Sequence, residues 1–224
     1  MKKLLIAAGV IAVLGLITVL IIFNMDWGER TSTVEKTEIE EAVDSVDENG
    51  IILPSLDDLE GMYDVDTESG KAELLFEIDG LKNTKGAFEK FEASFDIKDD
   101  FATSLLRVKI DAASINTEND MRDDHLKEPD YFDVKKYPNI IFESDNISFE
   151  EGTYTASGDL EFLGNTNSMD ITFEHNGGQD LEGDVRIEVF EGSFEFDRTQ
   201  YGMEEESGIG NIVSITFYVE LEKS

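Results

Sequence analysis

The stretch VSITFYVEL, residues 213–221, alternates apolar and polar side chains and sets the fold class. Its apolar positions are Val213, Ile215, Phe217, Val219 and Leu221, and the positions between them are Ser214, Thr216, Tyr218 and Glu220. Successive side chains of a β-strand point to opposite faces of the sheet, so this period of two predicts a strand with one buried face and one solvated face.

The same alternation recurs along the chain. It is clear at residues 74–78, 106–110, 169–173 and 185–189, and further strands are predicted near 63–67, 88–97, 139–144, 153–163 and 192–197. Two segments contain the glycines that are typical of hairpin turns, where glycine permits a positive φ: DNISFEEGTY (145–154) and LGNTNSM (163–169). Long helical stretches between strands are missing, which disfavours a parallel sheet. Residues 61–224 are therefore predicted to form an all-β antiparallel barrel of about eight strands, closed on itself without exposed edges.

One short helix interrupts this pattern. NTENDMRDDHLK (116–127) predicts about two helical turns, with Thr117 or Asn119 as the N-cap and Pro129 marking the end. Tyr131 and Phe132 follow, and Pro138 begins the next strand. We expect this segment to be a plug that covers the mouth of the barrel with apolar side chains.

The plug also carries a family resemblance. Arg122-Asp123, His125-Leu126, DYFDVKKYP (130–138) and IIFES (140–144) resemble the signature of the YceI-like family of polyisoprenoid-binding, lipocalin-like proteins. Supporting matches are KGAFEKFEASFDI (85–97), ASGDLEFLGNTNSM (156–169) and GSFEFDRTQYGM (192–203). The resemblance implies a lipocalin-like antiparallel barrel whose lumen holds a long-chain isoprenoid, an isoprenoid quinone or a similar lipid, usually outside the cytoplasm.

The candidate ligand-binding residues are apolar residues whose side chains are expected to point into the barrel. They are Phe76, Ile78, Val108, Ile110, Leu126, Phe132, Phe142, Phe162, Ile171, Phe173, Phe196 and Phe217. The residues alone favour a solid core, because an eight-stranded barrel is just wide enough to be filled by its own side chains. The resemblance favours a ligand tunnel instead. A solid barrel that serves as an envelope stress or protein-interaction module is the alternative function.

Four polar residues are candidates for contacting a ligand head group or for holding the plug: Arg122, Asp123, His125 and Arg198. A diphosphate head would need basic partners, and the net charge of −33 makes a neutral head such as a quinone at least as suitable. His125 is either a ligand contact or a helix residue bonded to a neighbouring group, and the second role is favoured. His175, beside the dipeptide Gly177-Gly178, is expected in a loop.

Catalytic chemistry has little support in the sequence. The chain has no cysteine and no G-x-S-x-G, P-loop, H-E-x-x-H or calcium-loop spacing. We expect a non-enzymatic binding protein without a cofactor or metal. The strong negative charge also repels phosphate backbones, so a nucleic-acid partner is not expected. The sequence leaves open whether the chain forms a homodimer.

The N-terminal segment has a different character. Lys2 and Lys3 precede 20 apolar residues, Leu4 to Phe23, which is the length of a transmembrane helix. Residues 1–23 are therefore predicted to be a signal anchor that inserts into the membrane. Residues 24–60 are predicted to be an acidic flexible tether, and residues 61–224 the barrel domain. Lysines before the span and acids after it place the barrel outside the cytoplasm, in a bacterial periplasm or cell envelope. Secretion after signal cleavage is the alternative.

Overall fold

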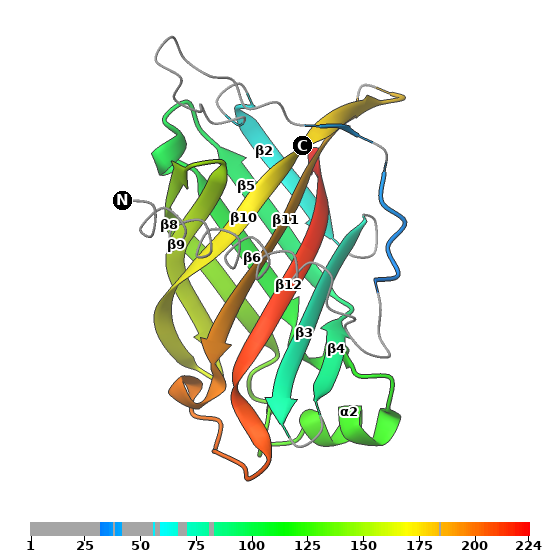
Figure 1. Ribbon diagram of the computed structural model, residues 1–224, viewed down its shortest axis with the longest axis vertical. Helices are drawn as coiled ribbons and strands as arrows, with labels where there is room; N and C mark the ends of the chain where they lie inside the picture. Colours follow the sequence, from blue (N-terminus) through cyan, green and yellow to red (C-terminus); the bar gives the residue numbers. More distant parts are fainter. Residues whose placement is uncertain are drawn as a thin grey trace, which may run out of the picture. The chain divides into compact units, whose positions relative to one another are not determined.

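The computed structural model describes residues 32–37, 39–41, 56, 59–66, 71–80, 83–183 and 185–224 (Figure 1). The predicted transmembrane anchor, residues 1–23, lies outside this part of the chain, as does most of the segment 24–60. No helix within the described residues has the length and apolar character that a membrane span requires.

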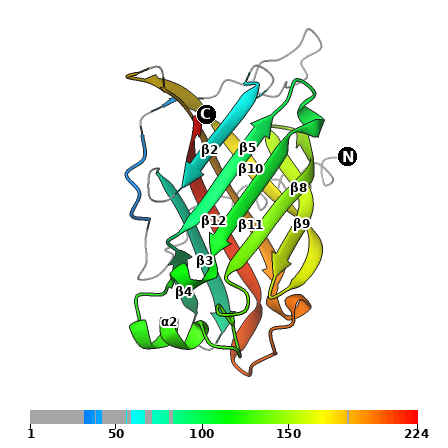
Figure 2. The same cartoon turned by 180° about the vertical axis from the view of Figure 1, so that it is seen from behind.

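Eight strands form the barrel. They are β2 (Gly61–Asp66), β5 (Phe91–Ile97), β6 (Leu105–Asp111), β8 (Asn139–Glu150), β9 (Thr153–Phe162), β10 (Asn165–Leu181), β11 (Val185–Asp197) and β12 (Ile209–Lys223). Each strand pairs antiparallel with the next, and β12 returns to β2 through Glu222 opposite Asp64 and Lys223 opposite Tyr63. This closed circuit confirms the predicted antiparallel barrel, and Figure 2 shows its other wall, with β2, β5, β8 and β9.

Three further strands extend the wall toward the helix. They are β3 (Ala72–Gly80), β4 (Thr84–Phe88) and β7 (Ile115–Asn116). β3 pairs with β12, β4 with β3, and β7 with β4. The remaining short elements are β1 (Glu40–Glu41) and the 3-10 helices η1 (Phe101–Thr103), η2 (Ala112–Ser114) and η3 (Arg198–Tyr201). Figure 1 shows β3, β4 and α2 at the same end of the barrel.

The two predicted hairpins are present. The β8–β9 turn has Glu151 at φ 51° and Gly152 at φ 88°, and the β9–β10 turn has Leu163 at φ 51° and Gly164 at φ 73°. Positive φ at both central residues is the geometry whose twist matches that of the flanking strands. The strands predicted separately at 185–189 and 192–197 are one continuous strand, β11.

The predicted helix is α2 (Asp120–Leu126). Of the two N-cap candidates the structure has Asn119, whose side chain accepts a hydrogen bond from the Arg122 N–H at 3.1 Å. Strand β8 begins directly after Pro138, as predicted. The segment from α2 to Pro138 is called the plug below.

Residues 32–37 and 39–41 of the segment 24–60 lie against the outside of the barrel. The N–H and hydroxyl of Thr37 donate to the two oxygens of Glu220 at 2.9 and 2.8 Å, Lys36 lies 4.4 Å from the centre of the Tyr218 ring, and β1 pairs with β10. Tyr218 and Glu220, which alternation assigns to the solvated face of β12, are therefore buried. Donors of residues 36 and 37 thus meet acidic groups of the barrel, and most of the predicted tether lies outside the described residues.

Candidate ligand-binding cavity

A cavity of about 480 Å³ occupies the end of the barrel that carries α2. Its lining is almost entirely apolar, with aliphatic residues such as Leu74 and Ile215 from strands β3 and β12. We call it the main chamber. The predicted ligand-binding residues that line it are Phe76, Ile78, Ile110, Leu126, Phe132, Phe162 and Phe196. A drug-sized ligand occupies a cavity of about 300–1,000 Å³, so the main chamber is large enough for one.

The plug covers the mouth of the main chamber, as predicted. The Phe132 ring packs between those of Phe88 and Phe162, at centroid distances of 5.8 and 5.4 Å. The Tyr131 hydroxyl donates to Glu206 Oε2 at 2.7 Å, which links the plug to the loop between η3 and β12. This hydrogen bond is the main reason that the pKa of Tyr131 is raised. The plug is thus held over the mouth by aromatic packing and one surface hydrogen bond.

Arg122 and Asp123 tie α2 to Thr117, the residue that follows β7. The buried Asp123 carboxylate accepts from the backbone N–H of Thr117 at 2.9 Å and also from its hydroxyl. Arg122 donates from Nε to Thr117 Oγ1 and from Nη2 to Thr117 O, both at 2.7 Å. Arg122 also lines the main chamber, whereas Asp123 does not. Asp123 therefore holds α2 in place, and Arg122 does the same while it also borders the main chamber.

Arg198 is a buried positive charge in the chamber wall. It is 2% exposed and donates to Gly210 O at 2.9 Å, to Glu204 O at 2.7 Å and, at a long 3.5 Å, to Asn211 Oδ1. Among the described residues no carboxylate lies within ion-pair distance of its guanidinium, so its partners are neutral oxygens. A buried charge is costly unless it is compensated, and a ligand that accepts hydrogen bonds would provide compensation.

Asp197 positions Arg198. Its carboxylate caps η3 by accepting from the Thr199 N–H at 2.9 Å and from the Thr199 hydroxyl at 2.6 Å. These hydrogen bonds to the charged form hold the pKa of Asp197 below its usual value.

His125 lies at the rim of the main chamber. Its ring is solvent-exposed and meets the Tyr131 ring edge-on, with the centroids 5.0 Å apart. No hydrogen bond of the His125 ring is present among the described residues, so the predicted bond to a neighbouring group is not seen. His125 therefore lies beside the entrance of the main chamber.

A second cavity of about 70 Å³, the inner chamber, lies deeper in the lumen. The remaining predicted ligand-binding residues line it: Val108, Phe142, Ile171, Phe173 and Phe217. Both chambers share Leu74, Ile110, Leu160 and Phe194, which form a neck between them. All twelve predicted residues therefore line one lumen, although they come from elements far apart in the sequence.

The inner chamber ends at three phenylalanines. The ring of Phe95 is 5.9 Å from that of Phe173 and 5.7 Å from that of Phe190, between centroids. Beyond them the described residues are closely packed. The largest fully buried side chains there include Tyr63, Tyr154, Ile97 and Ile147, each at most 1% exposed. Leu56, from the segment before β2, is also fully buried and donates its N–H to the Tyr154 hydroxyl at 3.2 Å.

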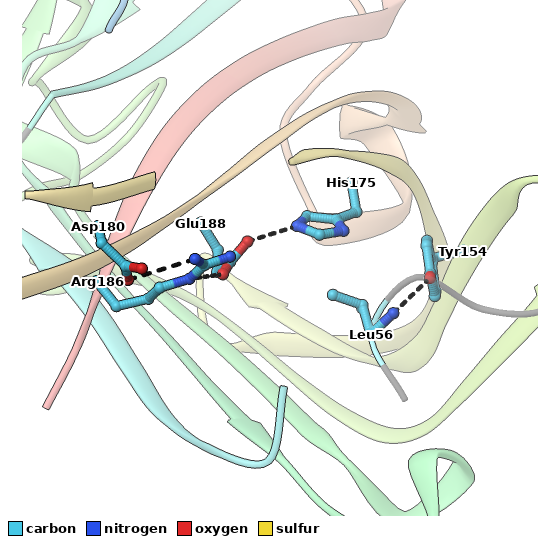
Figure 3. A network of polar contacts seen from close by, with 6 residues as sticks. All are labelled: Leu56, Tyr154, His175, Asp180, Arg186 and Glu188. Atoms are coloured by element: carbon cyan, nitrogen blue, oxygen red, sulfur yellow. Dashed lines mark hydrogen bonds and ion pairs between the residues drawn. The ribbon is translucent and has the colours of Figure 1, made fainter. Parts of the chain in front are cut away.

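A ladder of charged residues lies at this solid end (Figure 3). His175 Nε2 is 2.7 Å from Glu188 Oε2, Arg186 Nε donates to Glu188 Oε1 at 2.6 Å, and Arg186 Nη1 reaches Asp180 at 3.3 Å. The Glu188 side chain is completely buried. Burial, with a contribution from the Glu188 charge, raises the pKa of the neighbouring Tyr63.

Two sequence-based assignments are wrong at this ladder. His175 lies in β10, not in a loop, and Glu188 is buried although alternation predicts a solvated side chain. The Gly177-Gly178 pair belongs to the strand: a β-bulge lies between His175 and Gly177, and a Cβ on Gly178 would lie 2.2 Å from Glu188 Oε2. The glycine therefore makes room for a carboxylate, a reason that the sequence does not reveal.

Metal-ligand geometry is absent from the described residues, where no three His, Asp or Glu side chains are grouped to hold an ion.

Comparison with known proteins agrees with this architecture. The sequence profile of the YceI-like domain matches residues 63–221. The chain belongs to the YceI-like family. A UPF0312 protein of Vibrio cholerae is 29% identical to this YceI-like chain over 165 residues, which cover 71% of this chain and 83% of the relative.

Solved structures share the YceI-like fold. BcnA of Burkholderia cenocepacia has a TM-score of 0.61 at 22% identity, covering 67% of this chain and 96% of that chain. A polyisoprenoid-binding domain of Saccharophagus degradans has a TM-score of 0.55 at 14% identity, covering 74% of this chain and 99% of that domain. At these identities the likeness establishes the fold.

Proposed function

We propose that this YceI-like barrel binds a hydrophobic ligand, an isoprenoid or isoprenoid quinone, and sequesters or transports it without converting it chemically. The observation that carries the proposal is the main chamber, a cavity of about 480 Å³ with an almost entirely apolar lining. A solid-core interaction module has no use for such a space. The polyisoprenoid-binding domain of Saccharophagus degradans, which has the same fold, supports the ligand class.

Reversible exchange with a membrane suits this site. Burying each methylene gains about 0.8 kcal/mol relative to water, but a lipid tail has the same gain inside a bilayer. The free energy of transferring the tail from the bilayer to the chamber is then close to zero. Net affinity comes from shape fit and from a few polar contacts to the head group, and such a balance favours loading and release over permanent binding.

The head group lies near Arg198 and Arg122, the two guanidinium groups in the lining of the main chamber. A neutral head with carbonyl oxygens fits best. It accepts hydrogen bonds from the buried Arg198 without bringing a further negative charge to a chain of net charge −33.

The barrel works outside the cytoplasm in this proposal, anchored through residues 1–23. Support comes from the sequence: two lysines precede a 20-residue apolar run, and residues 24–60 contain 12 acidic and 2 basic residues.

Lipid extraction tests the function. The full chain would be purified in detergent and washed extensively, and its bound molecules identified by mass spectrometry against a detergent blank. Leu160→Arg places a charge in the neck between the chambers, and Leu105→Arg, at an exposed position on β6, is the matched control. We expect a hydrophobic molecule with the wild type and with Leu105→Arg, and its loss from Leu160→Arg while the circular dichroism spectrum stays that of a β-protein.

Two results would contradict the proposal. A wild-type chain without any bound molecule, together with unfolding of Leu160→Arg, would favour the solid-core alternative. Recovery of diphosphate lipids alone would overturn the neutral head group.

A further inference from the structure

We propose that residues 32–37 and 39–41 work as a strap, which docks on the outer wall of the barrel, shortens the membrane tether and so holds the main chamber close to the bilayer. This inference rests on the proposed anchoring through residues 1–23 and adds a control on how far the barrel moves from its anchor. The strap (blue in Figure 1) contacts four strands. Only the eight residues 24–31 separate it from the apolar run.

The strap attaches to neighbouring strands of one wall, in the order β3, β12, β11 and β10. The Thr33 N–H donates to Glu73 Oε2 of β3 at 2.9 Å. Lys36 forms an ion pair with Glu191 of β11, and Thr37 donates to the carboxylate of β12 described above. The two residues of β1 pair with β10. Strands β3 and β12 also line the main chamber, so the strap lies on the outer face of the chamber wall.

Charge makes this docking specific. Residues 24–60 contain 12 acidic and 2 basic residues, and residues 61–224 contain 39 acidic and 14 basic residues, so the two parts repel each other overall. Lys36 is one of the two basic residues of the segment. Its ammonium group meets the Glu191 carboxylate and lies 4.4 Å from the centre of the Tyr218 ring. Docking therefore depends on a cation at position 36.

The strap detaches without unfolding of the barrel, because it is held at the surface. The Lys36 side chain is 50% exposed, and Val34, Thr37 and Ile39 are only half-buried. None of the described strap residues belongs to the hydrophobic core. Exposed ion pairs contribute little to stability, so docking and release are close in free energy.

The state of the strap sets the length of the tether. With the strap docked, the eight residues 24–31 span at most about 28 Å. With the strap released, the next attachment among the described residues is Leu56, which is fully buried in the barrel. The 32 residues 24–55 then precede the attachment, and they span at most about 110 Å. Docking thus reduces the reach about fourfold and keeps the chamber near the membrane that supplies the ligand.

Energy transfer to a bilayer tests the strap. The chain has no cysteine, so Leu105→Cys, at an exposed position on β6, takes a single donor dye. The full chain would be inserted into phosphatidylcholine nanodiscs that carry an acceptor dye on the lipid. Lys36→Glu brings a like charge to Glu191, and we expect it to lower the transfer efficiency at least twofold. The charge swap that combines Lys36→Glu with Glu191→Lys is the matched control and should restore the wild-type efficiency.

Hydrogen exchange measures docking independently of reach. The amide hydrogens of Thr33 and Thr37 are bonded to Glu73 and Glu220, so they should exchange at least tenfold faster in Lys36→Glu than in the wild type. Thr37→Val keeps the N–H and loses the hydroxyl bond to Glu220, and its exchange should be intermediate. Peptides from β8, on the opposite wall, serve as the internal reference and should not change.

The outcomes separate the strap from the function on which it rests. Fast exchange of the Thr33 and Thr37 amides in the wild type overturns docking. Unchanged energy transfer in Lys36→Glu, although its strap amides exchange faster, overturns the control of reach. A wild-type chain that does not insert into nanodiscs overturns the proposed anchoring instead. Lipid binding by the barrel stands or falls by the extraction experiment alone.

Discussion

The two ends of this barrel are built by the same eight strands, yet one is hollow and the other is solid. At the solid end, aromatic side chains such as Phe95 and Phe173 reach across and touch. At the end with α2, aromatic and aliphatic side chains such as Phe76, Phe162 and Ile215 surround a cavity of about 480 Å³ instead. An eight-stranded barrel is just wide enough to be filled by side chains, and here they fill one end of it and not the other.

The largest effect is expected from breaking the solid end at Glu188. Glu188→Ala leaves the buried His175 and the Arg186 guanidinium without their shared carboxylate. A donor left without its acceptor costs about 1–3 kcal/mol, so the loss of both bonds should lower the free energy of unfolding in urea by roughly 2–6 kcal/mol.

Glu143→Ala is the control for Glu188→Ala. Glu143 pairs with Arg107 at 2.6 Å, but both side chains are more than half exposed. Exposed pairs contribute about 0–1 kcal/mol, and the control should lose no more than that. Equal losses in the two variants would show that the ladder does not stabilise the solid end.

Truncating one phenylalanine at each end sharpens the comparison. Phe95→Ala removes a ring that is 1% exposed and contacts the rings of Phe173 and Phe190, and should cost about 3–5 kcal/mol. Phe196→Ala removes a partly buried ring that already borders the main chamber, so about half that loss is expected. Both losses of unfolding free energy would be measured by chemical denaturation. A greater loss for Phe196→Ala than for Phe95→Ala would contradict the division of the barrel into a hollow and a solid end.

The smallest effect concerns Asp197 at the hollow end. The pKa of Asp197 is lower in the folded chain than its usual value of about 3.9, so its charged form stabilises the fold above that pH. This contribution is lost as the pH falls through the lowered pKa. Asp197→Ala should therefore be less stable than the wild type at neutral pH, and the difference should close in acid.

Urea denaturation at several pH values measures this difference. Thr199→Val, which removes only the side-chain hydrogen bond to Asp197, should show part of the pH dependence. A gap between wild type and Asp197→Ala that stays constant down to strongly acidic pH would contradict the assignment.

Local patterns were enough to predict much of the fold. The alternation at residues 213–221 predicts β12, and glycines at the two hairpins predict turns that the structure contains. The N-cap of α2 and the strand start after Pro138 also follow from local chemistry. These features depend on neighbouring residues only.

Features that depend on distant residues were missed. Nothing near Phe95 indicates that it meets Phe173 across the barrel, so the sequence could not decide between a tunnel and a solid core. Glu188 is read as solvated because its partner His175 precedes it by thirteen residues, on another strand. Tyr218 and Glu220 are covered by residues 36 and 37, more than 180 positions away.

The pairing of β12 with β2 and β3 also bears on the order of events during biosynthesis. β12 is translated after every other strand of the barrel, and its partners Asp64 and Tyr63 are among the first barrel residues to be made. Closure therefore waits for a contact of very long sequence separation, which slows folding. Until that contact forms, the wall around the main chamber is incomplete, so under the proposed function a ligand is loaded only after translation.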